Sequence, residues 1–169
     1  MLRKVLLALI PLLFITGCAT TEDDESGFSR TDVMFAEMMI PHHEQAIEMS
    51  DLALINTTNP SILELANEIK AAQAPEIELM SSWPGVDAMA HMGHSMSGML
   101  SDAEMAALAA ATGTEFDRLF LTGMIKHHEG AIEMAQDVVD SKNQTVVDLA
   151  DAIIEAQRAE ISRMQSLLD

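Results

Sequence analysis

The chain has 169 residues and a formal net charge of −18, with 27 Asp and Glu against 9 Lys and Arg. A surface this acidic repels phosphate backbones and attracts cations, which argues against nucleic-acid binding. Only 4% of the residues are aromatic, Tyr is absent, and Ala, Met, Leu, Glu and Ile are abundant, so the composition predicts a helical domain and not a β-sandwich or barrel. A single Cys excludes an internal disulfide framework and any Cys-based zinc or iron–sulfur site.

The N-terminus has the pattern of an export signal. Two basic residues precede the apolar run VLLALIPLLFI, which is short for a membrane span but typical of a signal-peptide h-region. The run leads into ITGC, ending at Cys18, which resembles the bacterial lipoprotein box whose Cys is diacylated. We expect a lipoprotein signal peptide at 1–17, lipidation of Cys18 and an acidic tether at 18–30; a plain secretory peptide is the alternative. By Gram-negative sorting rules, Ala19 favours an outer-membrane anchor facing the periplasm if the organism is Gram-negative.

An internal repeat covers most of the remaining chain. In the first part of each copy, equivalent residues lie 85 apart: Phe35/Phe120, Met39/Met124, His42/His127, His43/His128, Ala46/Ala131 and Met49/Met134. In the second part they lie 84 apart: Leu65/Leu149, Ile69/Ile153, Gln73/Gln157, Glu76/Glu160 and Met80/Met164. The slip between the two parts implies a loop, and the spacing of three and four residues on either side predicts two helices. Each copy is therefore predicted to be an αα-hairpin.

Two such hairpins predict an all-α fold. One hairpin cannot bury its apolar stripe alone, so the pair is expected to form an antiparallel, ferritin-like four-helix bundle over residues 31–169. The hairpins are expected at 31–83 and 114–169, joined by a connection at 84–113, with up-down and crossed topologies both open. The predicted N-caps are Ser29 or Thr31, Asn59 before Pro60, Thr114 after Gly113, and Asn143, and Ser101 with Glu104 has capping-box spacing.

The six His residues fall in three places: His42-His43, His127-His128, and the connection. On a helical wheel each pair flanks the buried line, whereas Glu44 faces water together with Glu48. The partner helices carry Gln and Glu within their apolar stripes, and a buried carboxylate costs several kcal/mol unless an imidazole or a metal compensates it. The candidate metal ligands of the bundle are Met39, His42, His43, Met49, Gln73 and Glu76, mirrored by Met124, His127, His128, Met134, Gln157 and Glu160. The two Glu residues either ligate directly or orient a ligating His, and a metal-free polar core network is the alternative.

The connection contains four Met and two His in the eleven residues MAHMGHSMSGM. Its candidate ligands are Met89, His91, Met92, His94, Met96 and Met99. Thioethers and imidazoles without thiolates suit Cu(I) or Ag(I), with Cu(II) bound by the imidazoles. Because Gly and Ser interrupt the segment, we expect these ligands to be flexible and to act independently of the bundle; a Met-rich linker without function is the alternative.

The sequences MIPHHEQAIEM and MIKHHEGAIEM, each followed by LA…I…AQ…EI…M, resemble the domain of unknown function 305 family, and the resemblance covers residues 32–168. It implies a ferritin-like four-helix fold and extracytoplasmic copper binding and tolerance through His and Met. The motif residues that match are Met39, His42, His43, Met49, Met124, His127, His128 and Met134. Neither His-His-Glu helix offers the Glu-x-x-His pair of di-iron proteins, which weakens a di-iron interpretation.

These observations favour a lipid-anchored extracytoplasmic protein that binds copper or silver and buffers it or hands it on, without catalysis. Its expected partners are the metal ion, the membrane through the lipid anchor, and a copper efflux or chaperone protein. Two alternatives stay open. One is a ferritin-like metal oxidase or peroxide scavenger, with Glu76 and Glu160 bridging two ions. The other is an envelope adaptor whose polar core only specifies helix pairing.

Overall fold

The computed structural model describes residues 27–169, so the predicted signal peptide, Cys18 and most of the tether lie outside the described residues. That part of the chain contains helices and no strand, which confirms the predicted all-α class. The helices are α1 (Arg30–Asn56), α2 (Pro60–Ser81), α3 (Asp102–Ala110), α4 (Gly113–Gln136) and α5 (Gln144–Leu168). Within residues 27–169 no helix combines the length and the apolar character needed to cross a membrane.

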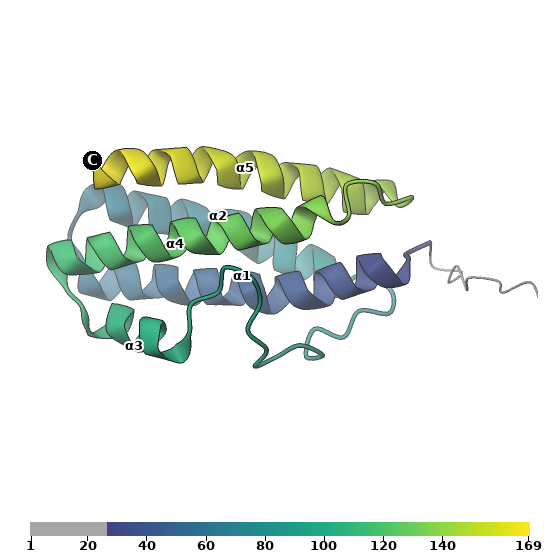
Figure 1. Cartoon of the computed structure of the whole chain (residues 1–169), viewed down its shortest axis with the longest axis horizontal. Coiled ribbons are helices and arrows are strands. Elements are labelled where there is room, and N and C mark those ends of the chain that lie inside the picture. Colours follow the sequence, from purple (N-terminus) through teal and green to yellow (C-terminus); the bar gives the residue numbers. More distant parts are fainter. Residues whose placement is uncertain (1–26) are drawn as a thin grey trace, which may run out of the picture.

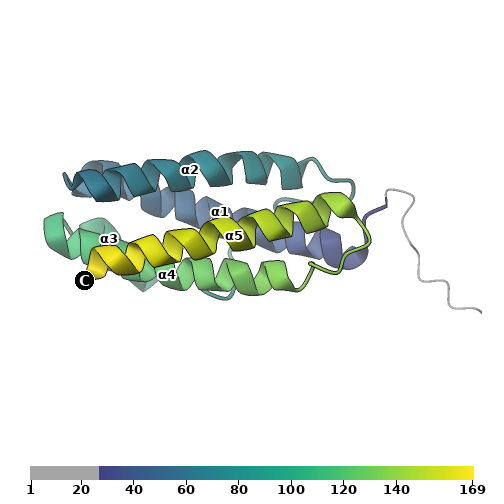
Figure 2. The same cartoon turned by 90° about the horizontal axis from the view of Figure 1, so that it is seen from above.

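The four long helices form two antiparallel hairpins with a crossed connection. Helix α1 packs against α2, α4 packs against α5, and α1 also packs against α4. Figure 1 shows that α2 and α4 run in the same direction, so the segment between them returns along the length of the bundle before α4 begins. Figure 2 shows the two hairpins side by side, and Arg163 of α5 forms ion pairs with Glu64 and Glu68 of α2. The single long crossover is the topology of ferritin-like bundles.

Side-chain caps begin most of the helices where the sequence predicts. The confirmed N-caps are Ser29, in a capping box with Asp32, Asn59 before Pro60, Ser101, in a capping box with Glu104, and Asn143. The prediction of Thr114 for α4 is wrong, because this helix begins at Gly113 after Thr112 and has no side-chain cap. Gly113 has a φ of 59°, which its missing Cβ permits, so a left-handed glycine turn leads into this helix.

A polar layer divides the hydrophobic core in two. One apolar cluster includes Phe35, Met39, Trp83, Met134 and Ile153, and the other includes Met49, Leu65, Phe120, Met124 and Met164. Along α1 and α4 the boundary between them is formed by the buried pairs His42-His43 and His127-His128. Burial of the two clusters supplies the main stabilisation of the bundle. The histidine layer lies in the middle, where water does not reach it.

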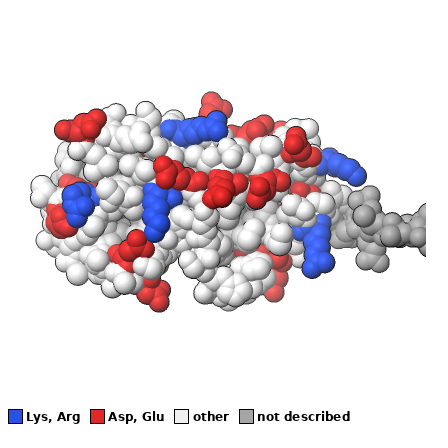
Figure 3. Space-filling view, in the orientation of Figure 1, with Lys and Arg blue, Asp and Glu red and all other residues white. Residues whose placement is uncertain are grey.

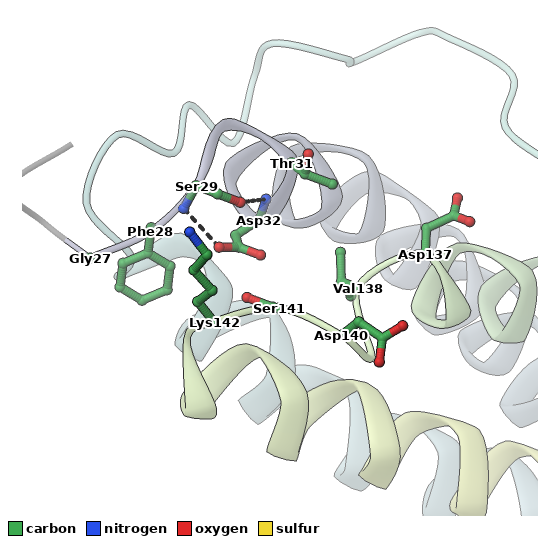
Figure 4. A pocket seen from close by; sticks show the side chains of 10 residues that line it. All are labelled: Gly27, Phe28, Ser29, Thr31, Asp32, Asp137, Val138, Asp140, Ser141 and Lys142. Carbon is green, nitrogen blue, oxygen red and sulfur yellow. Dashed lines mark hydrogen bonds between the residues drawn. The ribbon is translucent and has the colours of Figure 1, made fainter. Parts of the chain in front are cut away.

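The described chain begins at one end of the bundle, beside the turn between α4 and α5. There the Asn143 side-chain amide donates a hydrogen bond of 3.0 Å to the carbonyl of Gly27. Figure 4 shows the cavity at this junction, about 460 Å³ in volume, with Lys142 and Asp140 on one side and Ser29 with Asp32 on the other. The Asp32 carboxylate accepts a hydrogen bond from the Ser29 backbone N–H and so serves the helix start. The predicted tether therefore attaches at the end of the domain opposite the C-terminus (Figure 1).

Candidate metal centre

Helices α1 and α4 place four imidazoles at the centre of the bundle, and all four side chains are fully buried. The outer two are paired within their own hairpins. The His43 Nε2 atom lies 2.7 Å from a Glu76 carboxylate oxygen, and the His128 Nε2 atom lies 2.6 Å from one of Glu160. The carboxylates predicted to lie in the apolar stripes are thus each compensated by an imidazole from the neighbouring helix. Each carboxylate is about one-fifth exposed, at 20% and 19%, so its other oxygen can be solvated.

The inner two imidazoles face each other across the interface between the hairpins. The ring centroids of His42 and His127 are 3.8 Å apart, with the planes inclined by 40°. His42 Nε2 donates to the backbone carbonyl of Ser97 at 3.1 Å. Its Nδ1 atom and both ring nitrogens of His127 have no hydrogen-bond partner among the described residues. A buried polar atom without a partner costs about 1–3 kcal/mol, so this pair is an incompletely satisfied part of the core.

Burial keeps both inner imidazoles neutral. Loss of hydration, reinforced by the neighbouring His43, lowers the pKa of His42 from 6.5 to about 3. The pKa of His127 is lowered well below 6.5 by burial and by the adjacent His42 and His128. Neutral imidazole is the form that binds metal ions, because its lone pair is not occupied by a proton.

Two buried amides extend the polar layer along α2 and α5. Gln73 and Gln157 are 2% and 3% exposed, three residues before Glu76 and Glu160. Both amide atoms of Gln73 and the Oε1 atom of Gln157 lack a hydrogen-bond partner in the described part of the chain. The sequence therefore predicts the position of this polar layer correctly. The protein atoms alone leave the layer incompletely hydrogen-bonded.

The thioethers of the repeat do not gather into one site per hairpin. Met39 and Met134 belong to one apolar cluster, and Met49 and Met124 belong to the other. The layer of His side chains separates Met39 from Met49, so the predicted set within one hairpin is divided. Of these four Met residues, each side of the layer receives one from each hairpin. Within residues 27–169 no group of three or more His, Cys, Asp or Glu side chains is arranged to hold a metal ion. In this conformation the bundle layer is a closed polar core.

The connection carries a different arrangement at the surface. His91 and His94 face each other and share a hydrogen bond between their Nδ1 atoms, which are 3.3 Å apart. Two ligand nitrogens at about 2.0–2.1 Å from one tetrahedrally coordinated ion would lie about 3.3 Å from each other, so this pair has the spacing of a chelate. The Nε2 atom of His91 lies 3.8 Å from a carboxylate oxygen of Glu37, a partner of the kind that orients metal-bound imidazoles. No sequence pattern points to Glu37, because only the path of the crossover brings it to His91.

A surface cavity of about 470 Å³ lies between the connection and α1. Its lining combines soft and hard ligand types: Met92, His94, Met99, Glu44, Glu48 and Asp102. The predicted orientation of Glu44 and Glu48 toward water is confirmed, and their exposed side is one wall of this cavity. Met92 is 52% exposed and Met89 is 65% exposed, so neither thioether is core filling. The face in Figure 3 carries many more acidic than basic side chains.

The last part of the connection is fixed to the bundle. Residues 97–100, which we call the strap, cross the groove between α1 and α4. The Gln45 amide donates to the Leu100 carbonyl at 2.9 Å and accepts from the Leu100 N–H at 2.7 Å. The Ser97 hydroxyl donates to Glu133 at 2.6 Å, and the Ser97 carbonyl accepts from His42. The expectation of a flexible connection independent of the bundle is therefore wrong for the strap.

A crossed four-helix bundle made of two repeats, each with a buried His pair and a paired Glu, defines the class of this protein. The family model for the domain of unknown function DUF305 matches residues 32–168, and the chain belongs to this family. Among curated proteins, the uncharacterized protein L153 of Acanthamoeba polyphaga mimivirus is 43% identical over 54 residues, which are 31% of this chain. That match spans only about a third, 36%, of the length of the mimivirus protein.

Solved structures agree with the family and the fold. A DUF305 protein from Streptomyces coelicolor is 34% identical, with a TM-score of 0.74 over 82% of this chain and 91% of that one. A DUF305 fragment from Deinococcus radiodurans is 30% identical, with a TM-score of 0.74 over 83% and 96%. CopM in its Cu(I)-bound form is 35% identical, with a TM-score of 0.67 over 80% and 94%, and CopM structures also exist in Cu(II)-bound, Ag-bound and apo forms.

The buried imidazoles make stability depend on pH. The folded-state pKa values of His42 and His127 lie below 6.5. Below pH 6.5 the unfolded chain therefore binds protons at these two residues that the native state does not bind. The contribution of these two residues to the free energy of unfolding is fully present above pH 6.5. It is lost as the pH falls toward the folded-state pKa, which is about 3 for His42. We expect urea unfolding of the metal-free domain, measured between pH 7 and pH 5, to show that the free energy of unfolding falls below about pH 6.5. The decrease should be up to about 1.4 kcal/mol per pH unit for each of the two His residues.

Two variants provide the control for this measurement. His127→Gln removes one of the two titrating groups and should reduce the pH dependence by roughly half. His94→Gln changes an exposed imidazole and should leave it unaltered. A pH dependence that is the same in all three proteins would contradict the assignment to the buried pair.

Proposed function

We propose that this protein binds copper, as Cu(I) and Cu(II), and silver outside the cytoplasm, and that it buffers the metal or hands it to an efflux or chaperone protein. The observation that carries the proposal is the pair of facing Nδ1 atoms of His91 and His94, 3.3 Å apart. This spacing suits one ion held by two imidazoles. The Met residues around the pair add soft donors that favour Cu(I) and Ag(I) over hard cations.

The surroundings of the pair support the same function. The exposed thioethers of Met89 and Met92 can move to complete a coordination sphere, because neither is held in the core. The acidic side chains of Glu44, Glu48 and Asp102, which line the cavity beside the connection, raise the local concentration of cations. CopM, a relative of the same fold, has been crystallised with Cu(I), Cu(II) and silver.

A lipid anchor completes the proposal. The lipoprotein-like box at Cys18 would hold the protein at a membrane, and the acidic tether would join the bundle at Gly27. That end lies opposite the C-terminus (Figure 1), so the long axis of the domain can extend away from the membrane. In a Gram-negative organism the anchor would be in the outer membrane, facing the periplasm.

The proposed function requires no catalysis. An oxidase of the di-iron type needs carboxylates that bridge two ions, whereas Glu76 and Glu160 are each hydrogen-bonded to a His of their own hairpin. An adaptor would use the polar core for helix pairing alone. That core exists here, but an adaptor would not need an exposed pair of imidazoles among thioethers.

The test is anaerobic titration of the mature domain with Cu(I), read by competition with a chromophoric chelator, together with titration with Cu(II). His91→Gln with His94→Gln should remove the strongest surface Cu(II) site at pH 7, because both chelating nitrogens are lost. Helicity should stay unchanged, since His94 is exposed and His91 lies at the surface. Equal Cu(II) binding by the double variant and the wild type would refute the chelate.

The thioethers are tested separately. Replacing Met89, Met92, Met96 and Met99 by Leu keeps most of the apolar volume and removes the sulfur donors. We expect weaker Cu(I) binding at pH 5, where protons compete for imidazole nitrogens but not for thioethers. Met34→Leu is the matched control, because Met34 is 44% exposed on α1 outside the connection. If the fourfold variant binds Cu(I) at pH 5 as tightly as wild type, the connection is a linker only.

The anchor is tested in cells. Cys18→Ser removes the only thiol of the chain and should release the protein from membranes into the soluble extracytoplasmic fraction. Metabolic labelling with a fatty acid should be lost in the same variant. Labelling that persists would rule out Cys18 as the lipidated residue.

A further inference from the structure

A carboxylate of α1 holds the first part of the connection against the bundle. Glu37 uses both of its oxygens: Oε1 accepts a hydrogen bond of 3.0 Å from the backbone N–H of Asp87, and Oε2 lies 3.8 Å from Nε2 of His91. The Glu37 side chain is only 17% exposed, so water screens its charge less than that of Glu44, which is exposed on the same helix. The negative charge of Glu37 therefore acts strongly on the imidazole beside it.

The second copy of the repeat has no counterpart of this carboxylate. The residue equivalent to Glu37, 85 positions along the chain, is Thr122. Its hydroxyl donates a hydrogen bond of 2.9 Å to the carbonyl of Arg118 and so bonds within its own helix. The carboxylate is thus present in the copy whose helix contacts an imidazole of the connection and is absent from the other copy.

The contact between His91 and His94 holds one proton. Their Nδ1 atoms are 3.3 Å apart and share a hydrogen bond, so one Nδ1 donates and the other accepts. A neutral imidazole carries a single N–H, and its other nitrogen is an acceptor with a lone pair. The position of the proton on one His therefore determines its position on the other. Two arrangements satisfy the contact, and they differ in which Nδ1 atom presents its lone pair.

We propose that Glu37 is a positioning residue of the surface chelate, which selects between the two arrangements by keeping the proton of His91 on Nε2. The inference rests on the proposed function and adds the order in which the two imidazoles bind. A carboxylate beside Nε2 favours an N–H there, because a lone pair on Nε2 would face a negative charge. The Nδ1 atom of His91 then presents its lone pair, and Nδ1 of His94 carries the proton of their hydrogen bond.

This arrangement makes the two imidazoles unequal as ligands. His91 can bind an ion through Nδ1 without any change of protonation. His94 must first move its proton from Nδ1 to Nε2, an exchange that solvent water can mediate because His94 is exposed. The exchange consumes no net proton, since one proton leaves Nδ1 and one binds Nε2. His91 is therefore the entry ligand for the metal ion, and His94 completes the chelate.

The proton positions are tested in the metal-free protein. Nitrogen-15 NMR of protein labelled at His distinguishes a protonated from an unprotonated ring nitrogen, and at about pH 8 an exposed imidazole is neutral. In wild type we expect a proton on Nε2 of His91 and on Nδ1 of His94. An exposed imidazole without such a neighbour favours the proton on Nε2, so the arrangement at His94 is the distinctive result.

Glu37→Gln separates the charge of the side chain from its anchoring contact. The N–H of Asp87 needs an acceptor, so the amide oxygen of the variant faces Asp87 and the amide nitrogen faces His91. A donor beside Nε2 favours a lone pair there, and both His residues should therefore exchange their proton positions. Glu44→Gln is the matched control on the same helix and should show the wild-type pattern.

Three results would overturn the role of Glu37. One is a proton on Nδ1 of His91 in wild type. Another is the same proton positions in Glu37→Gln as in wild type. The third is a change in Glu44→Gln as large as that in Glu37→Gln. A merely structural role of Glu37 would alter the helicity or stability of the protein without exchanging the protons of the pair.

The order of binding is tested with Cu(II). Glu37→Gln should weaken Cu(II) binding about tenfold, because the lone pair of His91 no longer faces the incoming ion. In stopped-flow mixing, His91→Gln should slow the association of Cu(II) more than His94→Gln does. Equal association rates in the two single variants would overturn the order. If wild type binds no Cu(II), the proposed function itself fails, whereas the proton positions in the metal-free protein still decide the role of Glu37.

Discussion

The burial of four imidazoles in one layer of the bundle determines most of the structure around them. Each outer imidazole needs a hydrogen-bond acceptor, and Glu76 and Glu160 supply it from the neighbouring helices. These pairs fix the register within each hairpin, since sliding a helix by one turn would leave a partly buried carboxylate and a buried imidazole unpaired. The apolar residues are thereby divided into two clusters, and the inner imidazoles lie where the hairpins meet.

The crossed topology connects this layer to the surface. Because α2 and α4 run in the same direction, the connection must return along the outside of α1 before α4 can begin (Figure 1). That path brings the Met and His residues of the connection next to Glu37, Glu44 and Glu48 of α1. It also lays residues 97–100 across the groove above His42. The two copies of the repeat differ where the helices contact residues 97–100. Gln45 accepts a hydrogen bond from the Leu100 N–H, and the equivalent residue Gly130 leaves room for the Ser97 carbonyl.

Much of the fold could be predicted from local signals in the sequence. The repeat, the three-and-four spacing and the caps at Asn59 and Asn143 depend on neighbouring residues only, and each is present in the structure. The wheel also identifies the buried faces of His42 and His43 correctly. It does not show that Met39 and Met49 are separated, because ten residues along a helix span about 15 Å, more than one coordination sphere. The positions of Glu37 and of the strap depend on the path of the crossover, for which the sequence carries no periodic signal.

The surface of the connection and the buried histidine layer respond differently to the solution. At the surface, the attraction of acidic side chains for cations is screened within about 8 Å at physiological ionic strength, so salt should weaken the proposed capture of metal at His91 and His94. The inner imidazoles are buried and neutral, because loss of hydration lowers the pKa of both His42 and His127. Salt should therefore change how quickly metal arrives at the connection and hardly change the packing and hydrogen bonds of the buried layer. The surface proposed to meet the metal is thus sensitive to the medium, whereas the layer that fixes the register of the helices is not.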